Sequence, residues 1–262
     1  MTKLQMIGGG KMGQALLQGM LDADWATAEE LAVVEVLADQ RERLAKQYPS
    51  LTVIDRPLPK VDSVLAVKPH FVAEVCGSLR DPGRVLSIAA GVTIDTIESA
   101  LPAGTPVVRA MPNTPALVGA GAAGLAGGSQ AGPDDVEWAS GILSSVGQVV
   151  VVVESALDAV TGISGSGPAY LFLMAEAMTD AGVAVGLSRD VAAVLAKQTI
   201  YGAGKMMMET GTDPVELRAG VTTPAGTTAA GLGAMEDHGF RAGVAAAVRA
   251  ATQRSIELGK AD

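Results

Sequence analysis

The sequence predicts an α/β fold: a doubly wound, parallel sheet followed by an all-α C-terminal domain. Two observations carry this prediction. In the first part of the chain short apolar runs alternate with helical segments, whereas after Glu154 only long helical patterns rich in Ala, Gly and Met remain. Strand–helix alternation is typical of parallel sheets whose crossovers are helices. We therefore expect two domains, residues 1–154 and residues 155–262.

The expected strands of the first domain are apolar along their whole length. Runs such as VLSIAA and VVVVV lack polar alternation, as expected when helices cover both faces of a sheet. The strands are expected at 3–7, 31–36, 51–54, 62–67, 84–89, 105–110, 122–126 and 147–153. The helices between them are expected at 11–22, 39–48, 70–79, 93–100 and 134–145.

The second domain is expected to be helical throughout. Asp213-Pro214 marks one helix start, because Pro is favoured at the first helical position. Several of the helical segments are apolar around most of their circumference, and a domain of this size has too little interior to bury them all. This favours a partner subunit. The other helices are expected at about 168–185, 188–209, 226–237 and 240–259.

Composition narrows the classes of function. The chain has 262 residues and a formal net charge of −9 without a basic run, which argues against nucleic acid as a partner. A single cysteine, Cys76, excludes an internal disulfide and a cysteine-based zinc cluster. The two histidines, His70 and His238, are expected to be ordinary surface or loop residues, so no metal site is predicted.

No membrane association is expected either. The uncharged stretches 110–133 and 138–153 are broken by prolines, glycines or serines before they reach the length of a membrane span. A core strand is expected to begin at about Lys3, which leaves no room for a secretory signal. We therefore expect a cytoplasmic protein.

A glycine turn follows the first expected strand. Gly8, Gly10 and Gly13 form G-x-G-x-x-G immediately before the first helix. In a Rossmann-like fold the first glycine permits a tight turn, the second lets the backbone approach a pyrophosphate, and the third allows close packing. The helix N-terminus adds N–H donors and positive potential. An ordinary βα turn is the alternative. The expected cofactor contacts are Ile7, Gly8, Gly9, Gly10, Lys11, Met12 and Gly13.

Glu35 ends the second expected strand, where an acid accepts hydrogen bonds from the adenosine ribose. A carboxylate there favours NADH and repels the 2′-phosphate of NADPH. Arg41 and Arg43 follow within two helical turns and would suit that phosphate. The simpler interpretation, which we prefer, makes both arginines solvated helix residues, so NADH is favoured over NADPH.

Three further segments, AVKP, AAGV and MPNTP, follow expected strands. Ligands of open α/β sheets bind at the carboxyl ends of strands, where small residues would let a nicotinamide lie against the backbone. Each segment alone is also compatible with a simple strand-end turn, which the prolines of AVKP and MPNTP would suit. The expected cofactor contacts are Ala66, Val67, Lys68, Pro69, Ala89, Ala90, Gly91 and Asn113.

The segment VTTPAGTT, residues 221–228, is a loop that leads into a helix N-terminus. Backbone N–H groups and the helix dipole favour an anion there, and threonine hydroxyls add donors, so a carboxylate is the natural ligand. Helix capping is the alternative, but four threonines in eight residues exceed what a cap needs. With the glycine turn, this segment predicts a redox enzyme that brings a nicotinamide cofactor to a small carboxylated substrate.

Taken together, these motifs resemble the pyrroline-5-carboxylate reductase family over essentially the whole chain. The resemblance implies an NAD(P)H-dependent oxidoreductase acting on the CH–NH group, which reduces the cyclic imine 1-pyrroline-5-carboxylate to L-proline in the last step of proline biosynthesis. It also implies a homodimer or a higher homo-oligomer. The motifs that carry it, in chain order, are LAVKPH (65–70), SIAAGVTI (87–94), MPNTP (111–115), DAVTGISGSGPAY (158–170) and VTTPAGTT (221–228).

The same resemblance assigns the substrate site. The backbone around Thr227 and Thr228 and the hydroxyl of Thr223 would hold the carboxylate. The Thr228 hydroxyl would hydrogen-bond the ring nitrogen, as an orienting group and proton relay, which makes Thr228 the expected catalytic residue. The expected substrate contacts are Thr223, Gly226, Thr227, Thr228, Ser166 and Gly167.

The substrate turn departs from the family pattern VTSPGGTT, often preceded by Asn, at three positions. Thr223 replaces a serine and keeps the hydroxyl, Ala225 replaces a glycine, and Gly220 replaces the Asn. Ala225 is expected to have a negative φ, because only glycine adopts a positive φ without strain. Glu35 stands where the family often has a small or amide residue, which supports NADH.

Two other functions are alternatives to this one. A β-hydroxyacid dehydrogenase or another imine reductase would combine similar domains, but the former needs a catalytic lysine on the helical domain. The candidates there, Lys197 and Lys205, resemble helix-surface charges. A non-catalytic dinucleotide sensor would have no use for the threonine turn beside a nicotinamide site.

Overall fold

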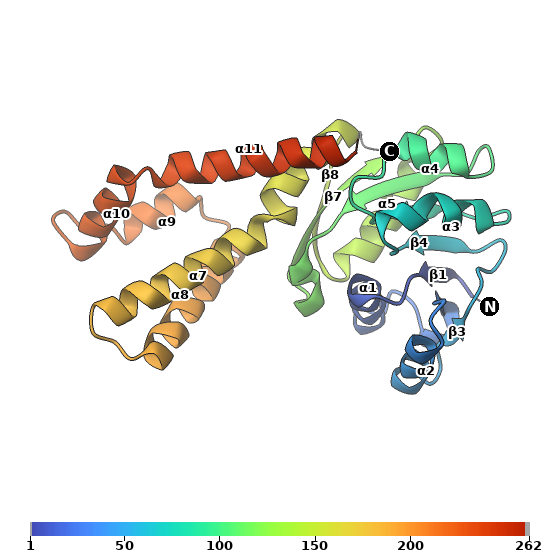
Figure 1. The fold of residues 1–262 in the computed structure, drawn as a ribbon, viewed down its shortest axis with the longest axis horizontal. Coiled ribbons are helices and arrows are strands. Elements are labelled where there is room, and N and C mark those ends of the chain that lie inside the picture. The colour runs from blue at the N-terminus through green and yellow to red at the C-terminus, as the bar shows by residue number, and fades with distance from the viewer. Residues whose placement is uncertain (1, 260–262) are drawn as a thin grey trace. The chain divides into compact units, whose positions relative to one another are not determined.

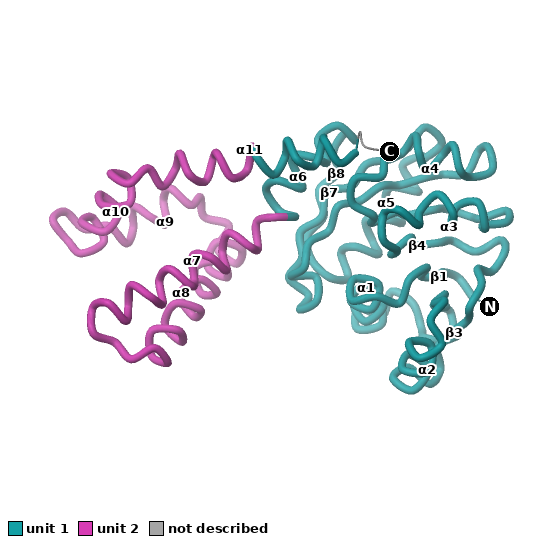
Figure 2. The backbone as a smooth tube through the Cα atoms, in the orientation of Figure 1, with its two compact units in different colours: residues 1–165, 250–262 teal, residues 166–249 magenta. Residues whose placement is uncertain are grey.

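The computed structural model describes residues 2–259 and divides into two compact units (Figures 1 and 2). Of the described residues, unit 1 contains 2–165 and 250–259, and unit 2 contains 166–249. The last helix, α11 (Phe240–Leu258), therefore contributes to both units. The assignment of residues 1–154 and 155–262 to separate functional domains remains a prediction.

Unit 1 is built on one eight-stranded sheet in the order β3-β2-β1-β4-β5-β6-β7-β8. Every expected strand is present, although several end two residues earlier than expected, because the chain leaves the sheet to form the loops at its carboxyl edge. The strands are β1 (Leu4–Ile7), β2 (Leu31–Val34), β3 (Thr52–Ile54), β4 (Asp62–Leu65), β5 (Val85–Ser87), β6 (Val107–Met111), β7 (Gly121–Gly127) and β8 (Gly147–Val151).

One strand pair corrects the expectation of a fully parallel sheet. β7 runs antiparallel to β6, whereas the other neighbouring pairs are parallel. Residues 112–120 join β6 to β7 and contain only the short 3₁₀ helix η3 (Thr114–Val118). A parallel connection needs a crossover of about a dozen residues or more. Helix α5 (Pro133–Ser144) supplies such a crossover between β7 and β8.

Helices cover both faces of the sheet, as a doubly wound fold requires (Figure 1). On one face, Leu16 of α1 and Ile142 of α5 share a buried cluster with Leu44 of α2. On the other, Ile97 of α4 and Leu157 of α6 share a second cluster with side chains of α3. Besides α5, the helices named here are α1 (Lys11–Asp22), α2 (Ala38–Gln47), α3 (Val72–Ser78), α4 (Ile94–Ala100) and α6 (Leu157–Val160), and the unit also contains the short turns η1 (Ala28–Glu30), η2 (Pro69–Phe71) and η4 (Glu154–Ala156) and the π-helical η5 (Thr161–Gly165).

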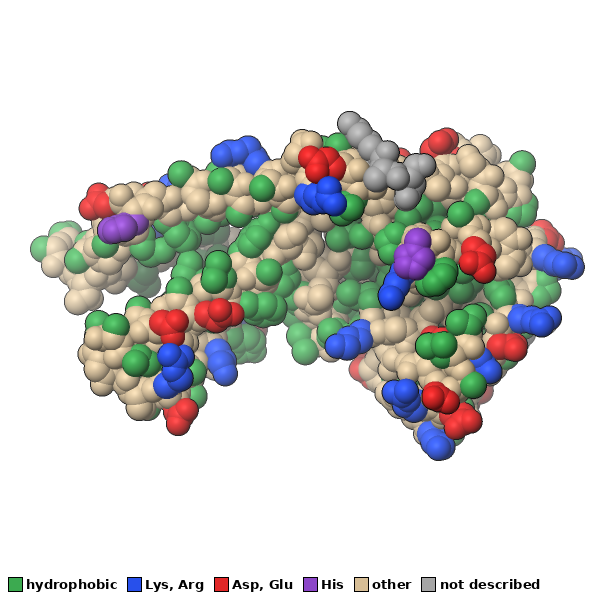
Figure 3. Space-filling view, in the orientation of Figure 1, with side chains coloured by type: hydrophobic (Ala, Val, Ile, Leu, Met, Phe, Trp, Pro, Cys, Tyr) green, Lys and Arg blue, Asp and Glu red, His purple; other side chains and the backbone are tan. Residues whose placement is uncertain are grey.

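Unit 2 consists of helices, as expected, and buries little of its own apolar surface. Within residues 166–249 the buried residues are Thr179, Ala192 and Ala196. Phe172 and Leu173 are exposed by 63% and 66% of their surface, and Figure 3 shows hydrophobic side chains along these helices. The helices are α7 (Gly167–Ala184), α8 (Arg189–Thr210), α9 (Pro214–Gly220), α10 (Thr227–Asp237) and the first part of α11.

Two further observations concern residues 2–259. None of the helices described there combines the length and apolarity that a membrane-spanning helix needs. The same part of the chain has no group of three or more His, Cys, Asp or Glu side chains placed to hold a metal ion.

Candidate active site

The glycine turn has the geometry of a dinucleotide cradle. Gly8 has a φ of 108°, and a Cβ there would lie 2.5 Å from the carbonyl oxygen of Ala66. A Cβ on Gly13 would overlap the carbonyl oxygen of Gly8. Around Gly10, by contrast, an added Cβ would meet no atom within 4 Å. The first and third glycines thus close the turn, while the second leaves the backbone open to a ligand.

Helix α1 begins directly behind this opening. Gly10 is its N-cap residue, makes no side-chain cap hydrogen bond, and is followed by a first turn without acidic residues. The first N–H groups of an α-helix have no partner within the helix, and the helix dipole favours an anion there. The cradle therefore fits a pyrophosphate.

Two glutamines hold the glycine turn in place, and the sequence analysis did not predict their role. Gln14 Nε2 and Gln40 Nε2 both donate to the carbonyl oxygen of Gly9, at 2.6 and 3.0 Å. One glutamine comes from α1 and the other from α2, so the turn is tied to two helices. No sequence motif predicts this pair, because the two side chains come together only in the folded structure.

Glu35 lies beside the glycine turn, at the end of β2. Its carboxylate accepts from the Gly9 N–H at 3.1 Å and from the Leu37 N–H at 2.9 Å. Arg41 Nη1 donates to the carbonyl oxygens of Glu35 and Val36 at 2.9 and 2.8 Å. Arg41 is therefore not the solvated helix residue that we expected: the guanidinium is drawn back onto the β2–α2 loop, whose carbonyls lack strand partners there.

The loops after β4 and β5 lie at the same edge of the sheet as the glycine turn, since β1, β4 and β5 are parallel neighbours. The Ala66 N–H donates to the carbonyl oxygen of Ile7 at 2.8 Å. Gly91 has a φ of 78°, which favours glycine. Ala66, Val67 and Ala89 are buried or half-buried, while Ala90 and Lys68 are exposed.

Asn113 is only 8% exposed, and its amide holds two segments of unit 1 together. Nδ2 donates to the carbonyl oxygen of Ser164 at 3.0 Å, and Oδ1 accepts from the Ala122 N–H at 2.9 Å. These bonds make Asn113 an anchor for the β6–β7 turn. Its expected contact with the cofactor remains a prediction.

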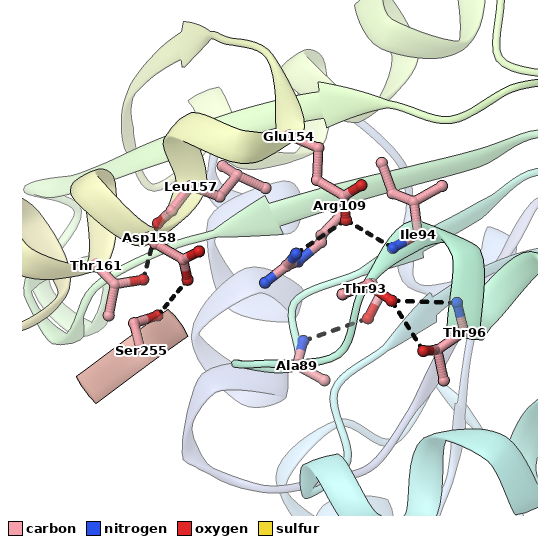
Figure 4. A network of polar contacts seen from close by, with 11 residues as sticks. Ala89, Thr93, Ile94, Thr96, Arg109, Glu154, Leu157, Asp158, Thr161 and Ser255 are labelled. Carbon is pink, nitrogen blue, oxygen red and sulfur yellow. Dashed lines mark hydrogen bonds and ion pairs between the residues drawn. The ribbon is translucent and has the colours of Figure 1, made fainter. Parts of the chain in front are cut away.

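A partly buried ion pair near the β5–α4 loop was also missed from the sequence (Figure 4). Arg109 Nη1 on β6 lies 2.9 Å from Glu154 Oε1, which also accepts from the Ile94 N–H at 2.7 Å. Arg109 is 8% exposed. The available signal was an arginine inside the apolar run VVRAM, where a buried charge requires a partner.

The threonine turn of unit 2 leads into α10 as expected. The Gly226 N–H donates to the carbonyl oxygen of Thr223 at 3.0 Å, with Pro224 and Ala225 between them. Ala225 has a φ of 56°, so our expectation of a negative φ was wrong. A turn with Pro in its second position and a positive φ in its third is of type II, which favours glycine at the site of Ala225.

Ala225 therefore carries backbone strain that can be measured. We expect Ala225→Gly to raise the free energy of unfolding by about 0.5 kcal/mol, because relief of about 1–2 kcal/mol of strain exceeds the entropy cost of glycine. Urea unfolding would measure it. As a matched control, Ala234→Gly inside α10 should lose about 1 kcal/mol. If both variants lost the same free energy of unfolding, Ala225 would be unstrained.

The N-terminus of α10 has features that favour an anion. Gly226 is the N-cap residue, with no side-chain cap hydrogen bond, and the first turn holds Thr227 and Thr228 without an acidic residue. Capping therefore does not explain these threonines. A Cβ on Gly226 would overlap the Thr223 hydroxyl, so glycine lets that hydroxyl lie against the turn. Thr222 is occupied differently: its hydroxyl donates to the carbonyl oxygen of Arg218 at 2.6 Å.

Ser166 and Gly167 begin unit 2, where Ser166 is the N-cap residue of α7 and Pro168 lies in the first turn. The residues before them form the π-helical turn η5. Hydroxyls of Thr161 and Ser164 donate to carbonyl oxygens one turn earlier, which holds this segment helical. π-Helical turns occur frequently at functional sites.

The cysteine, the histidines and the two lysines of α8 have structural environments that do not indicate a catalytic role. Burial raises the pKa of the Cys76 thiol to about 11, so the thiolate nucleophile does not form at neutral pH. His70 and His238 are exposed, as expected. Lys197 and Lys205 are exposed on α8, and Lys205 lies 3.5 Å from Glu209 one turn away. Both lysines are the helix-surface charges that the sequence indicated.

Comparisons with known proteins agree with this geometry. Residues 154–258 match the family described as pyrroline-5-carboxylate reductase dimerisation, and residues 3–91 match the family described as NADP oxidoreductase coenzyme F420-dependent. The pyrroline-5-carboxylate reductase of Methanosarcina acetivorans is 44% identical over 265 residues, covering 98% of either chain.

Solved structures extend the likeness to the fold. A pyrroline-5-carboxylate reductase from Coxiella burnetii has a TM-score of 0.91 at 33% identity, covering 98% of either chain. A pyrroline carboxylate reductase from Plasmodium falciparum, with NADP bound, has a TM-score of 0.81 at 30% identity over 98% of either chain.

Proposed function

The chain belongs to the pyrroline-5-carboxylate reductase family, and from this premise we propose that it reduces 1-pyrroline-5-carboxylate to L-proline with NADH or NADPH. The observation that carries the proposal is a pair of helix N-termini, those of α1 and α10, which have neither a side-chain cap nor an acidic residue in the first turn. The first suits a pyrophosphate and the second a substrate carboxylate. The enzyme would thus be an oxidoreductase acting on the CH–NH group.

The cofactor is assigned to unit 1. The glycine turn from Ile7 to Gly13 would hold the pyrophosphate, and Glu35 would accept from the adenosine ribose. The loops after β4 and β5, including Lys68 and Gly91, would hold the nicotinamide end. When bound, the nicotinamide supplies the hydride.

The substrate is assigned to unit 2. The N–H groups of Thr227 and Thr228 and the hydroxyl of Thr223 would bind the carboxylate, with Ser166 and Gly167 as neighbours of the ring. The Thr228 hydroxyl would hydrogen-bond the ring nitrogen, orienting the imine and relaying its proton. A protonated imine is already an electrophile, so these residues need to position it rather than activate it strongly.

The NADH preference can be tested at Glu35. We expect Glu35→Ser to raise the ratio of kcat/KM for NADPH to that for NADH by about tenfold, since it removes a carboxylate that repels the 2′-phosphate. Arg41, which donates to the Glu35 and Val36 carbonyl oxygens, lies nearby. Steady-state kinetics with both cofactors measure the ratio. Glu42→Ser, an equal change of charge on exposed α2, should leave it unchanged; an equal rise in both variants would contradict a local role.

Self-association is part of the proposal. Large apolar side chains of unit 2, among them Phe172, Val194 and Met208, are exposed by more than half in the single chain. Their number supports a homodimer or a higher homo-oligomer in which a second copy covers these helices. Sedimentation of the purified chain at the mass of one subunit would contradict this.

The reaction itself is tested by following NADH and, separately, NADPH oxidation by the purified chain with 1-pyrroline-5-carboxylate. Turnover that forms L-proline is the expected result. Tight cofactor binding by a folded chain without turnover would instead favour another imine or a non-catalytic dinucleotide sensor. Product identification by chromatography separates L-proline formation from unrelated cofactor oxidation.

A further inference from the structure

The loop between β5 and α4 is held at both ends by side-chain acceptors (Figure 4). At its start, the Ala89 N–H donates to Ser87 Oγ at 3.3 Å. At its end, the Ile94 N–H donates to Glu154 Oε1, which is fixed by Arg109. The middle of the loop, around Gly91, has neither of these ties, so its position depends on what packs against it.

The last turn of α11 packs against that middle. A Cβ on Gly91 would lie 3.9 Å from Leu258 Cβ and 4.0 Å from Gly259 N. A Cβ on Gly259 would lie 3.2 Å from the carbonyl oxygen of Gly91. An added Cβ would meet these atoms at van der Waals distance or closer, so the end of α11 lies close to Gly91 although it is more than 160 positions away in the sequence. The end of α11 thus limits where Gly91 can move.

One partly buried hydrogen bond fixes the end of α11. Ser255 Oγ donates to Asp158 Oδ1 at 2.6 Å, and Ser255 is 8% exposed (Figure 4). A hydroxyl–carboxylate bond of this length is of the stronger, charge-assisted kind. Asp158 lies one turn after Glu154, so a single short segment anchors both the end of the loop and the helix that packs on its middle.

We propose that the last turn of α11 is a positioning element for the nicotinamide end of the cofactor. The Ser255–Asp158 bond holds Leu258 and Gly259 against Gly91, and this keeps the backbone of residues 89–91 in place for the nicotinamide. The inference rests on the proposed function, in which these residues face that ring. Ser255 is a positioning residue, because it acts through the loop.

The test compares NADH with ADP-ribose, which retains the adenosine and pyrophosphate but lacks the nicotinamide. In the full chain, Ser255→Ala should raise the Kd for NADH about three- to tenfold, as expected for one lost hydrogen bond, and change that for ADP-ribose by less than about twofold. Titration calorimetry measures both. If Ser255 had a purely structural role, Ser255→Ala would weaken the binding of NADH and of ADP-ribose equally. That result would overturn the proposal.

Matched variants sharpen the result. Ser255→Thr keeps the hydroxyl and should restore NADH binding, and Arg254→Ala, with a side chain 66% exposed, should change neither Kd. If Ser255→Ala does not fold, Leu258→Gly removes the Cβ that lies nearest Gly91, at a residue 50% exposed, and should weaken NADH binding selectively. Unchanged NADH binding in the folded variants would also overturn the proposal. These binding measurements need no imine, so a failure of the proposed reaction is separately visible as lost turnover in the unaltered chain.

Discussion

Replacing Thr228 by alanine is expected to lower kcat/KM for imine reduction about 100-fold, which corresponds to about 2.7 kcal/mol of lost transition-state stabilisation. Thr228 is half-buried in the first turn of α10, where its hydroxyl is the proposed donor to the ring nitrogen. Without it, the imine loses both its orientation and its proton relay. Steady-state kinetics with varied imine concentration measure the effect.

The same variant should keep its fold and its cofactor affinity. Alanine is a better helix former than threonine, and no side-chain cap hydrogen bond is lost at the start of α10. The melting temperature and the Kd for NADH should therefore be nearly unchanged. Thr228→Ser retains the hydroxyl and should keep most of the activity. Unchanged kcat/KM in Thr228→Ala would remove the role assigned to this residue.

The fold could be predicted from the sequence largely because its signals are local. Apolar runs of strand length gave every strand, and the pair Asp213-Pro214 gave the start of α9, where the Asp213 side chain accepts from the Val215 N–H. The direction of β7 was missed because it depends on the length of the β6–β7 connection, not on the strand's own residues. The buried Gln5, which bonds Leu58 and Ser63, gave no local sign either.

For the candidate site, motifs located the two turns but not what supports them. The supports are pairs that meet only in the fold, such as Gln14 with Gln40 and Arg109 with Glu154. The backbone conformation of the threonine turn was not predicted either. The positive φ at Ala225 follows from Pro224 and the turn type, although alanine fits that position poorly. Spacing identifies a ligand site, whereas its rigidity depends on distant contacts.

The glycine turn allows binding and folding to be separated. We expect Gly10→Ala to raise the Kd for NADH at least tenfold while costing less than about 1 kcal/mol of stability. Gly10 has an ordinary φ of −71°, and an added Cβ meets nothing within the protein. The methyl group would instead occupy the space that the pyrophosphate needs. Fluorescence titration with NADH and thermal unfolding of the free protein measure the two effects.

Gly13→Ala provides the contrast, because its Cβ would overlap the carbonyl oxygen of Gly8 within the protein itself. Such overpacking costs about 1–3 kcal/mol, so this variant should lose stability as well as NADH affinity. If the second glycine faces the cofactor and the third faces the strand, only Gly13→Ala lowers the melting temperature strongly. Normal NADH binding by Gly10→Ala would show that the pyrophosphate binds elsewhere. It would also contradict the proposal that the cofactor lies across the carboxyl ends of β1, β4 and β5.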